Sequence, residues 1–191
     1  MNNNKEVIEV LNKQVAEWTV LFTKLHNYHW YVKGPNFFSL HEKFEELYDE
    51  NEEWFDKLAE VLLANGYRPI STTEKFLEYS SLKEDGADKY LSAERMVENL
   101  VDDYRVTRDL TTRTIEMAGE AEAFVLEGTL IGYKEALDKN IWMLQAFLGK
   151  EPHESPAGHV PHQAHVHNAV IRIRPRHALH PAAGVQGHVA D

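Results

Sequence analysis

The chain has 191 residues, a length that suits one domain of ordinary size. Its 31 acidic residues against 20 Lys and Arg give a formal net charge of −11, which disfavours binding to nucleic-acid phosphates. The absence of Cys excludes disulfides, thiolate zinc sites, iron–sulfur clusters and cysteine nucleophiles. No apolar run reaches the ~18 residues of a membrane span, and the Asn-rich start lacks a signal peptide's apolar segment. We therefore expect a cytoplasmic, acidic domain with no membrane partner.

The C-terminal residues differ in composition from the rest of the chain. Residues 155–191 contain three Arg, no Lys and one acidic residue, and they hold seven of the eleven His. They show no helical period, only the short strand-like run VIRIRP. We therefore divide the chain into a domain over 1–154 and an extension over 155–191. The extension is either an appended segment without a role or a loose metal- or partner-binding tail, because scattered imidazoles bind divalent ions weakly.

The first predicted helix carries one buried stripe, with residues at alternating steps of three and four. The residues of this stripe are Ile8, Leu11, Val15, Trp18, Phe22, Leu25 and His29. The helix must end before Gly34 and Pro35, which cannot continue it. A capping box of Ser39 with Glu42 predicts the start of a second helix, which runs to Gly66.

Two further helices are predicted over 92–119 and 126–148, so the domain is all-α. Short links join the first helix to the second and the third to the fourth, which predicts two antiparallel hairpins. The link of about 25 residues after Gly66 contains its own capping box, Ser71 with Glu74, before a short helix. Such a link is long enough to return along the bundle and make the second and third helices parallel. This topology is the one-crossover four-helix bundle of ferritin-like folds.

Two pairs of possible metal ligands lie on the second helix. His41 with Glu45, and Asp56 with Glu60, are each four residues apart and share a helical face. Histidine with carboxylates suits iron or another borderline divalent metal. The two pairs are separated by roughly 22 Å along a straight helix, so one subunit cannot bring all four residues to one ion.

A two-fold dimer would remove this difficulty. Positions 41 and 60 have the midpoint 50.5, and so do positions 45 and 56. If two copies of the helix cross antiparallel at this point, His41 approaches Glu60 of the second copy and Glu45 approaches Asp56, which makes two equivalent sites. Around the helix, positions 45 and 56 differ by only about 20°. The apolar residues expected to make contact around the axis are Leu47 and Trp54.

Simpler interpretations stay open on the residues alone. An acidic helix face is usually only solvated, and a histidine pair with Glu on a surface is usually inert. A lone histidine in a buried stripe, such as His29, is more often a hydrogen-bonded core residue than a ligand. We interpret His26 as structural, and Trp30 and Tyr31 as packing residues rather than redox groups.

The stretch HWYVKGPNFFSLHEKFEELYDE (29–50) resembles the Dps family, the ferritin-like mini-ferritins of bacteria named as DNA-binding proteins from starved cells. The resemblance continues in DKLAEVLLANGYRP (56–69) and DKNIWMLQAFLGK (138–150), and it covers roughly residues 5–152. Its most specific features are two histidines twelve residues apart and the acidic pairs at matching intervals.

This resemblance implies a ferroxidase that forms a hollow shell of twelve subunits. Such a shell oxidises Fe(II), preferably with hydrogen peroxide, and stores the Fe(III) mineral inside. Carried over by position, one subunit supplies His29 and His41, and a two-fold-related subunit supplies Asp56 and Glu60. Glu45 falls where many relatives have Asp, so its carboxylate is moved by about a methylene and its ligation is the least secure of the five.

Further assignments also follow from the resemblance. Trp30 would lie beside the site and take up stray oxidising equivalents. Acidic pores would draw cations into the shell. The candidates near the turn between the third and fourth helices are Glu116, Glu120, Glu122 and Glu127, although Gly128 stands where an acid is expected.

Two other functions compete with iron storage. The first is a stress-induced, nucleoid-compacting DNA binder, the activity behind the family's name. Residues 1–6 offer a single Lys where DNA-binding relatives carry basic arms, which argues against DNA binding through the domain. The only basic cluster is in the extension: Arg172, Arg174 and Arg176. The second is a purely structural bundle with a degenerate site, which the full set of expected ligand types disfavours.

Overall fold

The computed structural model describes residues 2–151, with side chains from residue 6 onward. In this part of the chain the regular structure is entirely helical, which confirms the all-α class. The four long helices are α1 (Asn2–Tyr31), α2 (Phe37–Ala64), α4 (Ala93–Glu120) and α5 (Phe124–Phe147). The link between α2 and α4 contains the short helix α3 (Thr73–Tyr79) and the 3-10 helix η1 (Gly86–Tyr90). The predicted boundary at 154/155 and the strand-like run lie outside the described residues.

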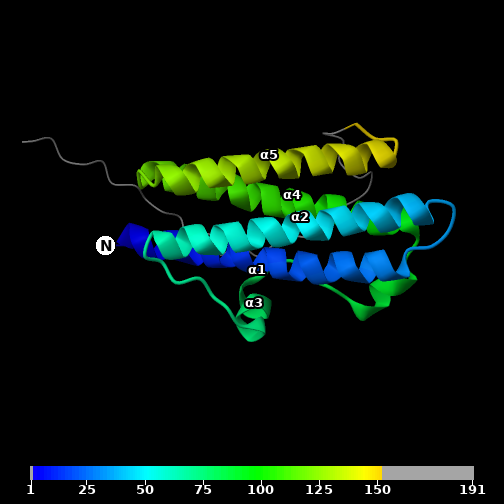
Figure 1. Ribbon diagram of the computed structural model, residues 1–191, viewed down its shortest axis with the longest axis horizontal. Coiled ribbons are helices and arrows are strands. Elements are labelled where there is room, and N and C mark those ends of the chain that lie inside the picture. The colour runs from blue at the N-terminus through cyan, green and yellow to red at the C-terminus, as the bar shows by residue number, and fades with distance from the viewer. Residues whose placement is uncertain (1, 152–191) are drawn as a thin grey trace, which may run out of the picture. The chain divides into compact units, whose positions relative to one another are not determined.

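The helices form two antiparallel hairpins, α1–α2 and α4–α5, packed into one bundle (Figure 1). The link that carries α3 and η1 runs back along α1, so that α2 and α4 point in the same direction. This arrangement confirms the one-crossover topology predicted from the lengths of the connections. Among residues 2–151, no helix is long and apolar enough to cross a membrane.

The predicted stripe of α1 faces the core. Five of its seven residues are buried, while Ile8 and Phe22 at its margin are half-buried. Trp18 lies near the middle of the bundle, where its ring meets that of Tyr133 edge-on at 4.6 Å and its Nε1 donates a hydrogen bond to the Tyr133 hydroxyl. The centre of the bundle is therefore filled by aromatic side chains that bridge α1 and α5.

The observed starts of α2 and α3 differ from the two predicted capping boxes. The residue preceding α2 is Asn36, and Ser39 lies inside the helix, where its Oγ donates to the Asn36 carbonyl at 3.1 Å. The cap of α3 is Thr72, one residue after Ser71, and its side chain accepts a hydrogen bond from the Lys75 backbone N–H. The predicted ends of α2 and α5 are confirmed. Gly66 (φ 80°) and Gly149 (φ 68°) follow these helices in the left-handed conformation typical of helix termination.

Candidate metal centre

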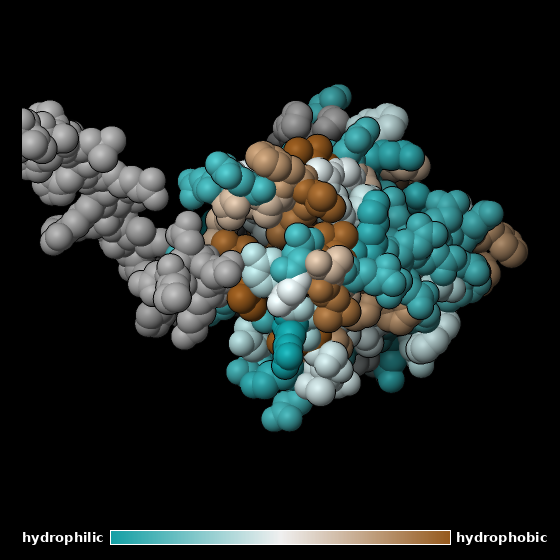
Figure 2. Space-filling view, turned by 60° about the vertical axis from the view of Figure 1, so that its left-hand side comes forward, coloured by the Kyte–Doolittle hydropathy of each residue, from teal (hydrophilic) through white to brown (hydrophobic). Residues whose placement is uncertain are grey.

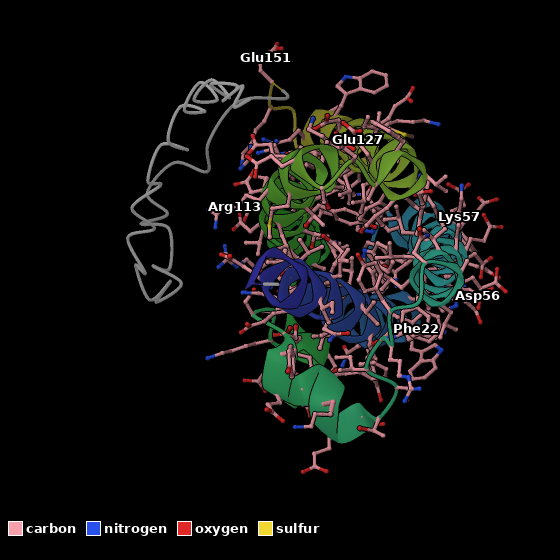
Figure 3. All side chains as sticks on the ribbon, turned by 90° about the vertical axis from the view of Figure 1, so that its left-hand side faces the viewer. Phe22, Asp56, Lys57, Arg113, Glu127 and Glu151 are labelled. Carbon is pink, nitrogen blue, oxygen red and sulfur yellow. The ribbon has the colours of Figure 1, made fainter. Side chains whose placement is uncertain are left out.

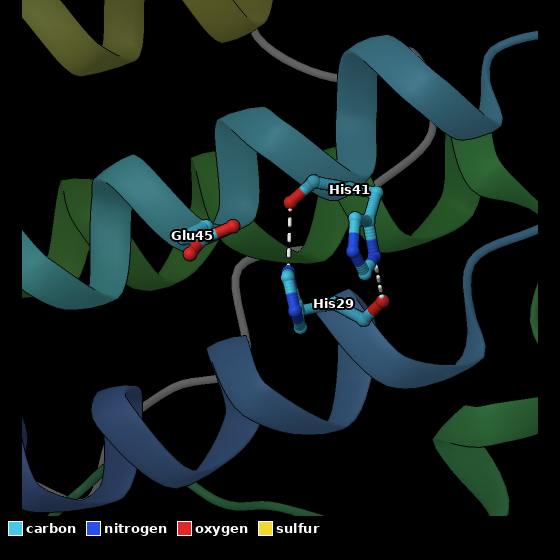
Figure 4. Close-up of side chains that lie close together, drawn as sticks. All are labelled: His29, His41 and Glu45. Carbon is cyan, nitrogen blue, oxygen red and sulfur yellow. Dashed lines mark hydrogen bonds between the residues drawn. The ribbon is translucent and has the colours of Figure 1, made fainter.

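Two histidines are brought together where α1 ends and α2 begins. His29 is in the last turn of α1 and His41 is near the start of α2, and the tight connection between these helices sets them side by side. Each imidazole Nδ1 lies 2.8 Å from the backbone carbonyl oxygen of the other histidine (Figure 4). The rings stack with centroids 3.7 Å apart and planes 19° from parallel. The two side chains therefore hold each other in a fixed orientation.

This reciprocal contact also sets which nitrogen faces a ligand. A carbonyl oxygen only accepts hydrogen bonds, so Nδ1 of both His29 and His41 must carry the proton. In the neutral imidazole, Nε2 then keeps its lone pair, which is the form that binds a metal ion. Tying one ring nitrogen to a fixed acceptor is the usual way in which proteins orient a metal-binding histidine.

Glu45 completes a three-residue group. It lies one turn after His41 on α2, and one ligand atom from each of the three side chains falls within 4.8 Å of the others. His29 is buried, His41 is half-buried and Glu45 is exposed, so the group opens from the core to the surface. Two imidazole nitrogens and a carboxylate suit a borderline divalent cation, and three ligands leave further coordination positions open.

Each of the two histidines also contacts an aromatic side chain. The ring of Phe37 stacks on His41 at 5.1 Å, and Tyr48 meets His29 edge-on at 5.4 Å. Partial burial, and then the negative charges of Glu45 and Asp49, raise the pKa of the Tyr48 phenol. Reasoning from the sequence missed both Phe37 and Tyr48. For Tyr48 the available signal was its position two helical turns after His41, on the same side of α2.

Asp56 and Glu60 are on the same helix but far from the two imidazoles of their own chain. Both are exposed on α2, and Asp56 points away from the bundle (Figure 3). Asp56 follows Glu45 by eleven residues, or roughly 16 Å of helix. Within one chain the structure thus brings together three of the five predicted ligands. The ligation by Asp56 and Glu60 stays a prediction that requires a second copy.

The proposed contact around the two-fold axis needs a correction. Leu47 is buried inside its own bundle, and Trp54 turns inward, where its ring lies 5.3 Å from that of Tyr133. Asn51 is buried as well and donates from Nδ2 to the Trp18 carbonyl oxygen at 2.8 Å. The apolar residues near position 50.5 therefore belong to the core of the subunit. The outward face of α2 at this level carries other side chains: Glu45, Asp49, Glu52 and Asp56.

The remaining candidates are distributed as follows. His26 is structural as predicted, since its Nδ1 lies 3.0 Å from the Phe22 carbonyl oxygen. Trp30 and Tyr31 are 66% and 47% exposed in the single chain, and each keeps one ring contact: Trp30 with His26 at 5.5 Å and Tyr31 with the Lys89 Nζ at 5.9 Å, so their role in packing stays a prediction. The candidate pore acids lie at the end of α4, in the following turn and at the start of α5. In this group Glu127 is half-buried and the other three are exposed: Glu116, Glu120 and Glu122.

Comparisons with known proteins agree with this architecture. The family model "Ferritin-like domain" matches residues 8–153. "DNA protection during starvation protein 2" of Bacillus anthracis is 49% identical over 147 residues, which cover 77% of this chain and 99% of the relative.

Solved structures of Dps proteins are also similar to this chain. The X-ray structure of Dps from Listeria monocytogenes has 42% identity and a TM-score of 0.75, covering 78% of this chain and 96% of that one. Dps from Staphylococcus aureus has 49% identity and a TM-score of 0.72, covering 75% and 95% of the two chains. With the family model matched along most of its length and these relatives covered almost completely, the chain belongs to the Dps family of ferritin-like proteins.

Proposed function

We propose that this protein is a cytoplasmic ferroxidase and iron store that oxidises Fe(II), preferably with hydrogen peroxide. The observation that carries the proposal is the pair His29 and His41, whose mutual hydrogen bonds leave both Nε2 atoms free beside the Glu45 carboxylate. Family membership supports the same function, and a structure of Listeria innocua Dps soaked with zinc shows that a relative has been studied with a divalent cation.

The chemistry follows from the ligand types. Carboxylates favour the harder Fe(III) over Fe(II), so they make the electron easier to remove, and the incomplete ligand set leaves a position where peroxide can approach. Two Fe(II) ions supply both electrons that one peroxide needs: 2 Fe²⁺ + H₂O₂ + 2 H⁺ gives 2 Fe³⁺ + 2 H₂O. This stoichiometry reduces peroxide fully and releases no hydroxyl radical.

A second copy of the chain completes the site in this proposal. Glu45 and Asp56 lie within about 20° of each other around α2, and both are exposed on its outward face. Two such faces related by a dyad would place Asp56 and Glu60 of one copy beside the histidines of the other. Each dimer would then hold two equivalent sites, and we infer that such dimers assemble into a shell of twelve subunits.

The test is peroxide-driven oxidation of Fe(II) by purified wild-type protein and by the Asp56→Ala and Glu60→Ala variants. We expect the initial rate of Fe(III) formation to fall by about tenfold or more in both variants, because each loses a metal ligand. Glu53→Ala is the matched control, since Glu53 is an exposed acid of the same helix outside the proposed ligand set. Equal rates in all four proteins, at equal assembly mass, would contradict the site assignment.

DNA protection is the second candidate, because several relatives carry that name. The acidic composition of the domain opposes it, so any DNA contact would involve Arg172, Arg174 and Arg176, which lie outside the described residues. Twelve copies of a weak basic segment would add their affinities by multivalency. A gel shift at low salt, with and without residues 155–191, decides between the two: a shift that needs the extension supports DNA binding, and no shift with either protein excludes it.

A further inference from the structure

Helix α2 ends at an Asn–Gly pair that is open to solvent. Asn65 follows the last residue of the helix, and Gly66 comes next in the left-handed conformation, with φ 80°. Both residues are exposed. Every other Asn of the sequence precedes a residue that has a side chain, so Asn65 is the one Asn that is followed by Gly.

The identity of the next residue matters because the main chain can attack an Asn side chain. The backbone nitrogen of the residue after Asn can bond to the Asn Cγ and close a five-membered succinimide ring. A side chain on that residue crowds the ring closure, and Gly has none. A Cβ placed on Gly66 would meet no other part of the described chain within 4 Å, so the pair is open to this reaction.

Asn36, at the start of the same helix, provides a comparison within the molecule. The two residues have almost the same backbone angles, with φ −97° and ψ 13° at Asn36 and φ −93° and ψ 10° at Asn65. Asn36 is half-buried and is followed by Phe37, whose ring stacks on His41 at 5.1 Å. Because the backbone conformation is shared, exposure and the residue that follows are what distinguish the two sites.

Hydrogen bonds to the last turn of α2 hold the Asn–Gly pair in place. The Asn65 Nδ2 donates to the Val61 carbonyl oxygen at 2.7 Å, and the Gly66 N–H donates to that of Leu63 at 3.0 Å. Both bonds must open before the ring can close. Opening the last turn of a helix costs less free energy than opening its middle, so local fraying of α2 gives access to the reactive geometry.

We propose that Asn65 is a site of spontaneous deamidation. The Gly66 nitrogen bonds to the Asn65 Cγ, the Cγ–Nδ2 bond breaks, and the Gly66 amide proton leaves with Nδ2 as ammonia. Water then opens the succinimide: cleavage at Cγ gives Asp, and cleavage at the main-chain carbonyl carbon gives isoaspartate. The atoms balance with water as the co-reactant, no electron is transferred, and the new carboxyl group passes its proton to ammonia at neutral pH.

The products change the end of α2 in three ways. Each places a negative charge at the C-terminus of the helix, where the last carbonyl groups are already partly negative. Each also removes the Nδ2 donor from the Val61 carbonyl oxygen. Isoaspartate in addition lengthens the main chain by one carbon atom, which displaces the N–H groups of Gly66 and Tyr67 from their carbonyl acceptors. The end of α2 therefore loosens as the protein ages.

The experiment incubates the full-length protein for several weeks at neutral and at mildly alkaline pH, and maps its peptides by mass spectrometry. Asn65 should be converted to acid in a growing fraction of chains, with isoaspartate in excess of Asp, while Asn36 keeps its amide. Conversion should be faster at the higher pH, because the Gly66 amide must lose its proton to attack. The matched variant is Gly66→Asn, which keeps the left-handed conformation and adds a side chain, and it should slow conversion of Asn65 several-fold.

An Asn65 that keeps its amide as long as Asn36 does would overturn the proposal. So would Asp without isoaspartate, because direct hydrolysis gives Asp alone. The loosening of the helix end is tested by amide hydrogen exchange on Asn65→Asp, with Asn65→Gln as the control that retains an amide. Exchange at Gly66 and Tyr67 should be several-fold faster in Asn65→Asp, and equal exchange in the two variants would overturn this consequence.

Discussion

Lys24 and Asp103 form an ion pair between α1 and α4, with Nζ and Oδ2 2.6 Å apart and the two side chains 7% and 14% exposed. Burial raises the pKa of Asp103 to about 6, although Lys24 attracts the charged form and opposes this rise. The negative charges of Asp102 and Glu17 also raise it, to a smaller extent. The carboxyl group of Asp103 therefore binds its proton more tightly in the folded chain than in the unfolded one.

This difference predicts a pH-dependent contribution to stability. The folded pKa is above the ordinary value of 3.8, so the folded state holds more protons between pH 4 and 6, and the contribution of Asp103 falls as the pH rises through that window. Asp103→Asn does not titrate. The difference in free energy of unfolding between wild type and this variant, from urea titrations, should decrease by about 2–3 kcal/mol from pH 4 to pH 7. A constant difference would contradict the raised pKa.

His29 shows how far a single residue can be interpreted from its spacing. The stripe of α1 predicted a buried histidine, and the resemblance to the Dps family implied that this histidine is a metal ligand. Both interpretations fit the structure, because Nδ1 is satisfied by a backbone carbonyl while Nε2 is left free. The stacking of the two rings and the position of Tyr48 depend on how closely α1 and α2 pack, which no spacing within one helix contains.

At the scale of the elements, Glu17 fastens the long crossover to α1. Its carboxylate is fully buried and accepts hydrogen bonds from the side chains of Ser80 and Ser81 and from two backbone N–H groups, Ser81 at 2.9 Å and Leu82 at 3.0 Å. A buried carboxylate is tolerated only when its oxygens are satisfied in this way. The crossover is therefore held by a specific contact as well as by apolar packing.

Glu17→Gln should destabilise the fold by about 2 kcal/mol or more. The amide replaces one acceptor oxygen with an NH₂ group that faces the donors of the crossover, so buried N–H groups lose their acceptor. The measurement is the urea-unfolding midpoint of the variant against Glu9→Gln, an exposed Glu of the same helix, which should match wild type. Equal midpoints for Glu17→Gln and wild type would show that the contact does not hold the crossover.

The elements also show where sequence reasoning is reliable. The lengths of the connections predicted the topology, because two helices joined by a short link must lie antiparallel to each other. Helix ends at Gly66 and Gly149 followed from the conformational freedom of glycine. Helix starts were predicted less well. The cap residue of α2 is Asn36, which makes no side-chain cap hydrogen bond, and the chain turns at Gly34 (φ 101°) just before it. At α3 the cap is Thr72 rather than Ser71, because a threonine hydroxyl accepts the same hydrogen bond. Ser92 was predicted correctly, and its side chain accepts from the Arg95 N–H.

At the scale of the whole molecule, the shared midpoint 50.5 of the two ligand pairs predicted where a two-fold axis would cross α2. It did not predict which face of α2 would meet that axis. Leu47 and Trp54 satisfy the same symmetry as the ligands, yet they lie on the opposite side of the helix. Which face is outward is set by the packing of α2 against α1 and α5. Two of the five proposed ligands, Asp56 and Glu60, would therefore act only on the histidines of a second chain.

The proposed metal centre depends on the assembly state of the protein. Large apolar side chains are exposed where α2 ends and α5 begins, including Leu63, Phe124 and Val125, and Figure 2 shows hydrophobic surface at this end of the bundle. Exposed apolar side chains gathered in this way are typical of a surface through which subunits associate. Light scattering should give a mass of about twelve times the 22.0 kDa chain. Phe124→Glu together with Val125→Glu should lower that mass, whereas Glu122→Gln in the adjacent turn should not. A wild-type protein that stays monomeric at all concentrations would leave Asp56 and Glu60 without histidines to join.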